Sequence, residues 1–219
     1  MKKEIKYLLA VVGIVAAASF GIYQSALKQN EKPQSITIAP NFPLITNLAA
    51  NHSFSYGPEN AKVTVVEFFD PECESCSAVS PYIKKEMKFY EGKVRWVFRY
   101  MPYHFNSKTA IAVLEAARKQ NLFLESMELL FTTQKKWGEK QVSMKNEIIE
   151  IVSRVPSMDK QRLLAELENP ANQQIIEQDA QEGKMAGVKG TPTFFVNGVI
   201  LERLDLDGLI ARINAELAK

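Results

Sequence analysis

The sequence predicts an α/β fold in which a central mixed sheet is flanked by helices and interrupted by an inserted all-helical segment. Three observations indicate this fold class. Residues 63–69 are almost continuously apolar, residues 106–186 place apolar side chains at three- and four-residue spacings, and strand-forming residues return at 193–201. A continuous apolar run is typical of a strand that is covered on both faces, and a chain of 219 residues is long enough to bury such a core.

The first residues of the chain form a membrane-targeting segment. Residues 7–23 contain no charged side chain, and three of the six residues before them are lysines. Their length lies between the ~7–15 residues of a secretory signal and the ~20 of a membrane span. Three alanines at 16–18 would suit a signal peptidase, but the apolar character continues past them, so we expect residues 1–27 to be an anchor rather than a cleaved signal peptide. In both cases the lysines stay in the cytoplasm, which places the rest of the chain in the periplasm or on the extracytoplasmic face of a bacterial inner membrane.

Residues 28–56 are predicted to be a tether, because they contain three prolines and show no sustained helical or strand period apart from a possible short strand at 36–38. Residues 63–69 then form a central strand. Residues 77–90 have a helical pattern and residues 93–100 alternate in polarity. Strand, helix and strand in this order predict a parallel unit.

The helical segment, residues 106–186, is predicted to form an inserted domain of four or five helices. Boundaries are expected near residues 137–138 and 155–156, with Ser157 as a possible helix cap.

After this insertion the chain returns to strands. Residues 193–196 and 199–201 are separated by Asn197 and Gly198, and Asn-Gly is the strongest short signal for a β-hairpin. Asp205 can cap a final amphipathic helix.

Composition and cysteine spacing restrict the function. The 27 Lys and Arg residues nearly balance the 25 Asp and Glu residues, so no electrostatic field favours nucleic acid.

Cys73 and Cys76 are the two cysteines, and a disulfide between them would close too small a ring to restrain the unfolded chain. A chemical role therefore explains them better than a structural one. We expect no metal site, because zinc would need two further ligands and the sequence has only two histidines.

The spacing of this dithiol suits redox chemistry. Cys73 is predicted at the junction of a strand and a helix, where backbone N–H groups and the helix dipole stabilise the thiolate that attacks disulfides. Cys76, one turn later, should be shielded. Strand alternation points Glu67 toward the core, where burial would raise its pKa and let it exchange a proton with Cys76. Alternatively, Glu67 reaches solvent or pairs with Arg95 or Arg99.

Taken together, these residues resemble a known family. Over about residues 54–218 the chain is similar to thioredoxin-fold proteins, and within them to the DsbA-like group of exported thiol:disulfide oxidoreductases. The motifs that support the resemblance are Glu67-Phe68-Phe69-Asp70, Cys73-Glu74-Ser75-Cys76, Arg99 with Pro102, and the segment from Gly187 to Gly198 around Gly190-Thr191-Pro192. The resemblance implies a thioredoxin-fold domain of residues 57–105 and 187–219, with residues 106–186 inserted.

The resemblance also implies roles for single residues. Pro192 should follow a cis peptide bond beside the dithiol, and Thr191 should offer backbone hydrogen bonds to a bound peptide. Glu67 matches the family's buried acid, and Pro81 matches the kink in its first helix. Arg99 would pair with Glu67 or shape the surface near the site, unless it is an exposed strand arginine.

One feature departs from the family pattern. Glu74 and Ser75 separate the cysteines and Glu72 precedes Cys73, whereas strongly oxidising members often carry histidine or proline between the cysteines. Two nearby carboxylates oppose a thiolate, so we predict a weaker oxidant than the extreme of the family.

The predicted function is disulfide exchange with exported proteins that contain cysteines. We expect an oxidase that forms a mixed disulfide through Cys73, which Cys76 resolves, and that a membrane redox partner recycles. No cofactor is expected beyond the Cys73–Cys76 disulfide itself. The alternatives are a reductase or isomerase of the same fold, for which residues 28–56 are too short to supply a dimerisation domain, and a peptide-binding, chaperone-like module.

Overall fold

The computed structural model describes residues 48–219. The predicted membrane anchor, most of the tether and the strand expected at 36–38 lie outside the described residues. Within residues 48–219, none of the helices is both long and apolar enough to cross a bilayer.

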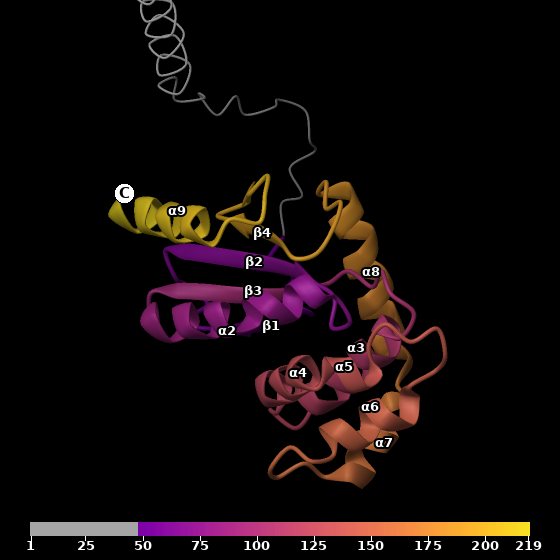
Figure 1. Ribbon diagram of the computed structural model, residues 1–219. Coiled ribbons are helices and arrows are strands. Elements are labelled where there is room, and N and C mark those ends of the chain that lie inside the picture. Colours follow the sequence, from indigo (N-terminus) through magenta and orange to yellow (C-terminus); the bar gives the residue numbers. More distant parts are fainter. Residues whose placement is uncertain (1–47) are drawn as a thin grey trace, which may run out of the picture. The chain divides into compact units, whose positions relative to one another are not determined.

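A five-stranded mixed sheet forms the centre of the molecule, with the strand order β1-β3-β2-β4-β5 (Figure 1). Strand β2 is central, runs parallel to β3 and is antiparallel to β4. This confirms the predicted fold class and the central position of residues 63–69. The strands are β1 (Phe54–Tyr56), β2 (Val63–Phe69), β3 (Val94–Tyr100), β4 (Thr193–Val196) and β5 (Val199–Ile200).

The edge strand β1 was predicted to be part of the tether, and that prediction is wrong for residues 54–56. These residues pair antiparallel with β3, with Phe54 opposite Phe98. The ring of Phe54 also stacks on that of Phe123, with 4.1 Å between centroids. Partners so distant in sequence leave no local period in a three-residue strand, which explains why the pattern did not indicate it.

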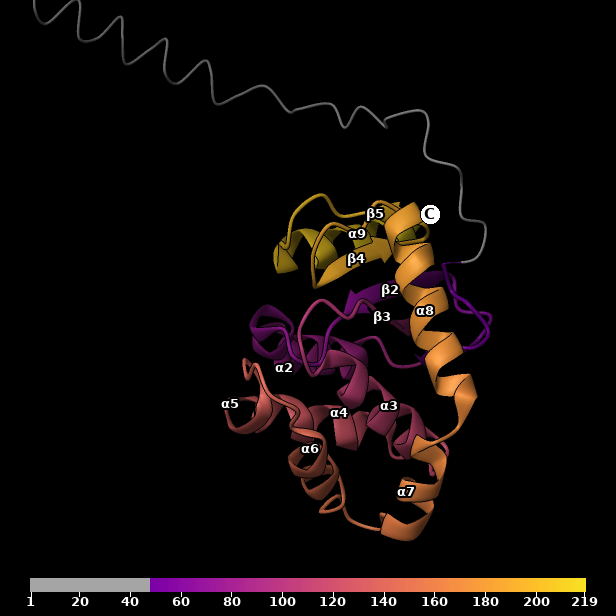
Figure 2. The ribbon, with the colours of Figure 1, turned by 90° about the vertical axis from the view of Figure 1, so that its right-hand side faces the viewer.

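The described part of the chain contains eight helices. Six of them lie between β3 and β4, not the four or five predicted, partly because a four-residue helix ends at Trp137 beside Gly138. Figure 1 shows α3 to α7 as one group, and Figure 2 shows α8 running from this group past the sheet toward β4. The helices are α2 (Glu74–Phe89), α3 (Ser107–Arg118), α4 (Phe123–Thr132), α5 (Gln134–Trp137), α6 (Lys145–Val152), α7 (Lys160–Leu167), α8 (Pro170–Met185) and α9 (Leu206–Ala218).

One predicted turn and two predicted helix caps lie within the described residues. Asn197 and Gly198 have φ angles of 47° and 81°, as a hairpin turn of the predicted kind requires. Ser157 does not cap α7; Asp159 does, by accepting hydrogen bonds from two backbone N–H groups of the first turn. Asp205 precedes α9 but makes no capping hydrogen bond with its side chain.

The two faces of the sheet are packed differently. On the first face, α2 and α9 join Val63, Val65 and Phe69 of β2 in the main core, which continues into the helical insertion. On the second face, a smaller cluster includes Val66 and Phe68 of β2. Helix α8 covers this second face so closely that a Cβ atom on Gly183 would lie 2.9 Å from the Phe68 ring.

Candidate functional site

The two cysteines lie at the start of α2, directly after the central strand. Cys73 is the N-cap residue of α2 and has extended backbone geometry, and Cys76 lies in the first turn. Cys76 is fully buried and Cys73 is 9% exposed. Cys73 is therefore less open than predicted, because the loop that contains Thr191 lies against it.

The environment of Cys73 stabilises its thiolate. A hydrogen bond from the Cys76 thiol makes the largest contribution, and it outweighs the opposing effect of burial. Further hydrogen bonds come from the Thr191 side chain and from the backbone N–H groups of Cys76 and Ser75. Together they lower the pKa of Cys73 from 9.0 to about 5, so that Cys73 is ionised at neutral pH when reduced.

Cys76 and Glu67 form the buried side of the site. Burial raises the pKa of the Cys76 thiol well above its usual value, and the hydrogen bond to Cys73 and the charge of Glu67 add to this effect. Burial, followed by the charge of Cys73, raises the pKa of Glu67 to about 8. No hydrogen bond or ion pair of the Glu67 carboxyl is found within residues 48–219. The structure thus places an acid, a protected thiol and a thiolate together.

Thr191 and Pro192 lie beside Cys73, on the loop that leads into β4. The peptide bond between them is cis. The Cys73 sulfur lies 3.3 Å from the backbone carbonyl oxygen of Thr191, to which Cys73 donates a hydrogen bond when it is protonated. The dithiol and this loop, separated by 118 residues in sequence, therefore meet at one edge of the sheet.

The acidic residues around Cys73 act differently from the prediction. The Glu72 carboxylate is buried and accepts hydrogen bonds from the backbone N–H groups of Asn106 (2.6 Å) and Glu139 (2.9 Å). It therefore links the dithiol loop to the helical insertion. Glu74 and Ser75 are exposed. None of the largest contributions to the pKa of Cys73 comes from Glu72 or Glu74.

Arg99 is neither exposed nor paired with Glu67. It lies opposite Phe68 in the parallel register, whereas Glu67 lies opposite Phe98, so Arg99 and Glu67 point to opposite faces of the sheet. The fully buried Arg99 guanidinium contacts Asp179 at 2.5 Å and Glu182 at 2.6 Å, both on α8. Both predicted roles of Arg99 near the dithiol are therefore wrong.

Two residues that the sequence did not single out, Asp70 and His104, lie beside the dithiol. The buried Asp70 carboxylate accepts hydrogen bonds from the backbone N–H groups of Glu72 (2.9 Å) and Tyr103 (2.7 Å), and lies 2.8 Å from His104 Nδ1. The Asp70 carbonyl accepts from the backbone N–H of Cys73. Asp70 belongs to the motif quoted for the family resemblance, but nothing in the sequence pairs it with a histidine 34 residues away.

Gln134 also supports the dithiol loop. Its side-chain amide is buried and donates to the backbone carbonyls of Pro71 (2.9 Å) and Cys73 (3.1 Å). The helical insertion therefore contacts the dithiol loop through Gln134 as well as through Glu72.

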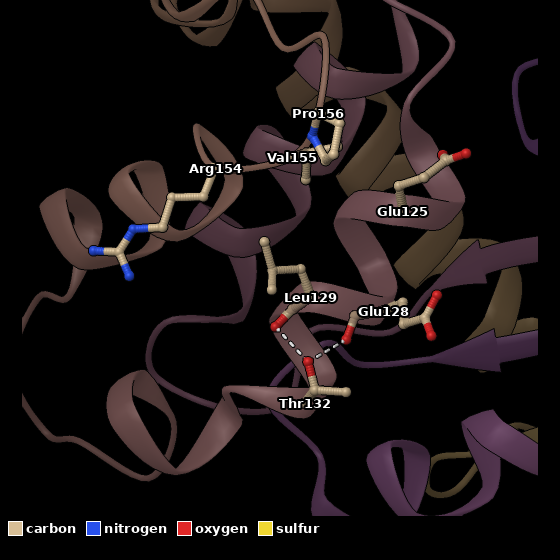
Figure 3. A pocket seen from close by; sticks show the side chains of 7 residues that line it. All are labelled: Glu125, Glu128, Leu129, Thr132, Arg154, Val155 and Pro156. Carbon is tan, nitrogen blue, oxygen red and sulfur yellow. Dashed lines mark hydrogen bonds between the residues drawn. The ribbon is translucent and has the colours of Figure 1, made fainter.

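A pocket of about 320 Å³ lies on the helical insertion, between α4 and the loop after α6 (Figure 3). The residues that line it include no cysteine or histidine, so it offers no thiol chemistry. Within residues 48–219, no group of His, Cys, Asp and Glu side chains is arranged to hold a metal ion. The pocket is lined by Glu125, Glu128, Leu129, Thr132, Arg154, Val155 and Pro156.

A Cys-x-x-Cys dithiol at the start of the helix that follows the central strand is the arrangement of a thioredoxin-like redox motif, as the sequence resemblance implied. The chain belongs to the thioredoxin family, since the family model described as Thioredoxin matches residues 49–215. This match covers the sheet, the dithiol and the helical insertion.

Two kinds of relatives are similar to this chain in sequence. The Probable disulfide bond formation protein D of Bacillus anthracis is 28% identical over 172 residues, which cover 75% of this chain and 78% of the relative. The Na(+)/H(+) antiporter NhaA of Herminiimonas arsenicoxydans is 30% identical over 142 residues, which cover 65% of this chain. This chain spans only about a fifth of that antiporter, 22% of its length, so the antiporter's activity is not carried over.

Two solved structures have the same fold. Oxidised BdbD from Bacillus subtilis matches with a TM-score of 0.67 and 24% identity, over 75% of this chain and 92% of that chain. The alpha-DsbA1 protein of Wolbachia pipientis also matches with a TM-score of 0.67, at 16% identity, over 77% of this chain and 92% of that chain. At these identities the likeness is one of fold, and it confirms the predicted thioredoxin-like architecture.

Proposed function

We propose that this chain exchanges disulfides with other proteins through Cys73 and Cys76 and that it works as an oxidase. The observation that supports this most strongly is the contrast between the two sulfurs: the pKa of Cys73 is lowered to about 5, whereas that of the buried Cys76 is raised. One sulfur is thus a stable thiolate that leaves easily, and the other is held as a protected thiol.

In the oxidising direction a substrate thiolate attacks Cys73 Sγ of the disulfide. A bond forms between the substrate sulfur and Cys73, and the bond between Cys73 and Cys76 breaks with its electron pair on Cys76. A second substrate thiolate then attacks the first substrate sulfur and expels Cys73 as a thiolate. The substrate gains a disulfide and loses two electrons, and the Cys73–Cys76 pair gains both. The sequence led us to expect that Cys76 resolves the mixed disulfide of an oxidase, but in the oxidising direction the second substrate thiolate must do so, and Cys76 attacks the mixed disulfide only in the reducing direction.

Glu67 supplies the proton that this cycle requires. When Cys76 leaves as a thiolate in a buried site, its high pKa favours rapid protonation, and burial raises the pKa of Glu67 so that its carboxyl can supply the proton. In the opposite direction the Glu67 carboxylate takes the proton from Cys76. Thr191 and Pro192 flank the attacked sulfur, where the backbone of Thr191 would hold an extended substrate segment.

The pKa of Cys73 also bears on the direction of electron flow. A stabilised thiolate favours the reduced dithiol and makes the disulfide a stronger oxidant. A value of about 5 lies between the ~7 of thioredoxin and the ~3.5 of the most oxidising members. We therefore propose an oxidase of intermediate strength, with a reduction potential less negative than the roughly −270 mV of thioredoxin.

We also propose where the protein acts and with which partners. The apolar segment at residues 7–23 would deliver the chain across a bacterial inner membrane and anchor it there. Its substrates would be exported proteins with cysteines, and a membrane redox partner would reoxidise the dithiol. Residues 57–105 with 187–219 would be the thioredoxin-fold domain, and residues 106–186 the inserted helical domain.

Two cysteine variants test the exchange activity. In assays of insulin reduction and of oxidative refolding of a reduced protein, Cys73→Ala should abolish both activities. Cys76→Ala should instead accumulate a mixed disulfide between Cys73 and the substrate, visible on non-reducing gels. Unchanged activity of Cys73→Ala would refute the proposal, and a wild-type potential at or below that of thioredoxin would favour a reductase over an oxidase.

A further inference from the structure

His104 and Asp70 form a charged pair next to the dithiol that the exchange mechanism does not use. His104 lies on the loop between β3 and α3, and its Nδ1 atom is 2.8 Å from Asp70 Oδ2. Asp70 is fully buried, whereas the His104 side chain is 43% exposed. The buried Asp70 carboxylate thus has an imidazole partner that can take up a proton from solvent.

The backbone of Asp70 connects this pair to both cysteines. Its carbonyl accepts the backbone N–H of Cys73, and its own backbone N–H is hydrogen-bonded to the Cys76 sulfur. The loop of His104 is fixed on the other side by Tyr103, whose hydroxyl donates to the Val188 carbonyl, three residues before Thr191. His104 is therefore held between the two segments that meet at the dithiol.

The charges that contribute most to the pKa of His104 are all negative. They belong to Asp70 and Glu72 in the loop after β2 and to the Cys73 thiolate. Burial of the ring opposes its protonation, but the hydrogen bond and charge of Asp70, followed by the charge of Cys73, raise the pKa of His104 above its usual value. An imidazolium at this position therefore interacts favourably with the reduced dithiol.

We propose that His104, oriented by Asp70, is a positioning residue that stabilises the Cys73 thiolate electrostatically and makes the oxidising strength of the dithiol depend on pH. This inference rests on the proposed redox role of the dithiol. The two residues between the cysteines, Glu74 and Ser75, include no cation. In this proposal the cation near Cys73 is His104, on the loop between β3 and α3.

The redox balance defines the pH window. Two glutathione thiols reduce the disulfide and become glutathione disulfide. The two electrons go to the Cys73–Cys76 pair, one proton stays on Cys76, and the other is released because Cys73 remains a thiolate. The new negative charge raises the pKa of His104, so reduction also takes up a fraction of a proton at His104 between its two pKa values. Below this window the imidazolium favours the reduced form. Above it His104 is neutral and the effect disappears.

The test compares His104→Gln, which removes the cation, with His104→Lys, which keeps a cation to much higher pH. His52→Gln is a matched control, because His52 forms a similar pair with Asp179, at 2.7 Å, on the other face of the sheet. Two quantities are measured on each full-length variant: the pKa of Cys73, from thiolate absorbance of the reduced protein, and the equilibrium constant with glutathione at about pH 6 and about pH 9.

His104→Gln should raise the pKa of Cys73 by up to about half a unit. At about pH 6 its equilibrium with glutathione should shift about two- to threefold toward the disulfide, which a two-electron couple registers as about 9–14 mV. At about pH 9 wild type and His104→Gln should agree, while His104→Lys keeps the low-pH behaviour of wild type. His52→Gln should match wild type in both quantities.

Two results would overturn the inference. The first is a pKa of Cys73 that is equal in wild type and His104→Gln. The second is a difference in equilibrium constant that is the same at both pH values, since a merely structural role would produce it. The glutathione equilibrium involves no protein substrate, so wild type that fails to oxidise proteins would refute the proposed function without affecting this comparison.

Discussion

Glu67 and Arg99 are both buried charged residues of the central sheet, but they lie on opposite faces in very different surroundings. Arg99 is bonded to Asp179 and Glu182, and Asp179 also accepts from the backbone of Tyr100. Glu67 is 6% exposed and has no such partner within the described residues. On one face the charge of Arg99 is compensated by its ion-pair partners. On the other face no partner compensates the Glu67 carboxylate, so protonation removes its charge.

This difference separates a structural from a chemical use of burial. An ion pair with its hydrogen bonds satisfied keeps its charges at every ordinary pH, whereas a lone buried carboxyl shifts its pKa until the neutral form dominates. The pKa of about 8 for Glu67 is the result of such isolation. The same comparison predicts opposite responses when the charge on each face is removed.

Removal of the paired charge of Arg99 should change the stability of the protein more than removal of the Glu67 charge. Arg99→Met keeps much of the apolar chain but leaves the buried Asp179 with His52, at 2.7 Å, as its remaining basic partner. Loss of one partner of a buried ion pair typically costs about 3–5 kcal/mol, so the free energy of unfolding from denaturant titration should fall by roughly that amount.

Two further variants show whether the loss of stability in Arg99→Met comes from the buried ion pair. Arg203 is exposed, and Arg203→Met should change stability by less than about 0.5 kcal/mol. Adding Asp179→Asn to Arg99→Met should recover part of the loss, because the uncompensated charge is then gone. A loss below about 1 kcal/mol for Arg99→Met would show that the two faces do not differ as described.

Removal of the isolated charge should stabilise the protein. The pKa of Glu67 is raised on folding, from 4.5 to about 8, so its carboxylate form disfavours the folded state. Wild type should match Glu67→Gln near pH 4 and lose stability relative to it as pH rises from about 4.5 to about 8. With about 1.4 kcal/mol per pKa unit, Glu67→Gln should be more stable by about 3 kcal/mol at pH 7 in the reduced protein.

Glu59 provides the control for this pH dependence. It is exposed, so Glu59→Gln should follow the wild-type stability curve throughout. A Glu67→Gln variant that is less stable than wild type at pH 7 would mean that the carboxylate is compensated in the folded state.

The sequence predicted the parts of the site that local patterns define. The apolar run of β2, the spacing of the cysteines and the Asn197-Gly198 turn each depend on neighbouring residues. Alternation along β2 also correctly indicated that Glu67 is buried. The cis bond before Pro192 followed from the family resemblance alone.

The charged pairs could not be predicted, because their members are brought together by the fold. Asp70 and His104 are 34 residues apart, and Arg99 and Asp179 are 80 apart. The direction of Arg99 depends on the register of β3 against β2, which sets Arg99 opposite Phe68. A shift of one residue would have placed it on the same face as Glu67, and the sequence does not specify that register.

The most direct test of this account is the pKa of Glu67, measured by ¹³C NMR of its labelled carboxyl in both redox states. In the reduced protein we expect a value of about 8, and in the oxidised protein a lower value, because the Cys73 thiolate no longer adds its charge. A pKa near 4.5 in the reduced protein would contradict the claim that an isolated buried acid serves the dithiol.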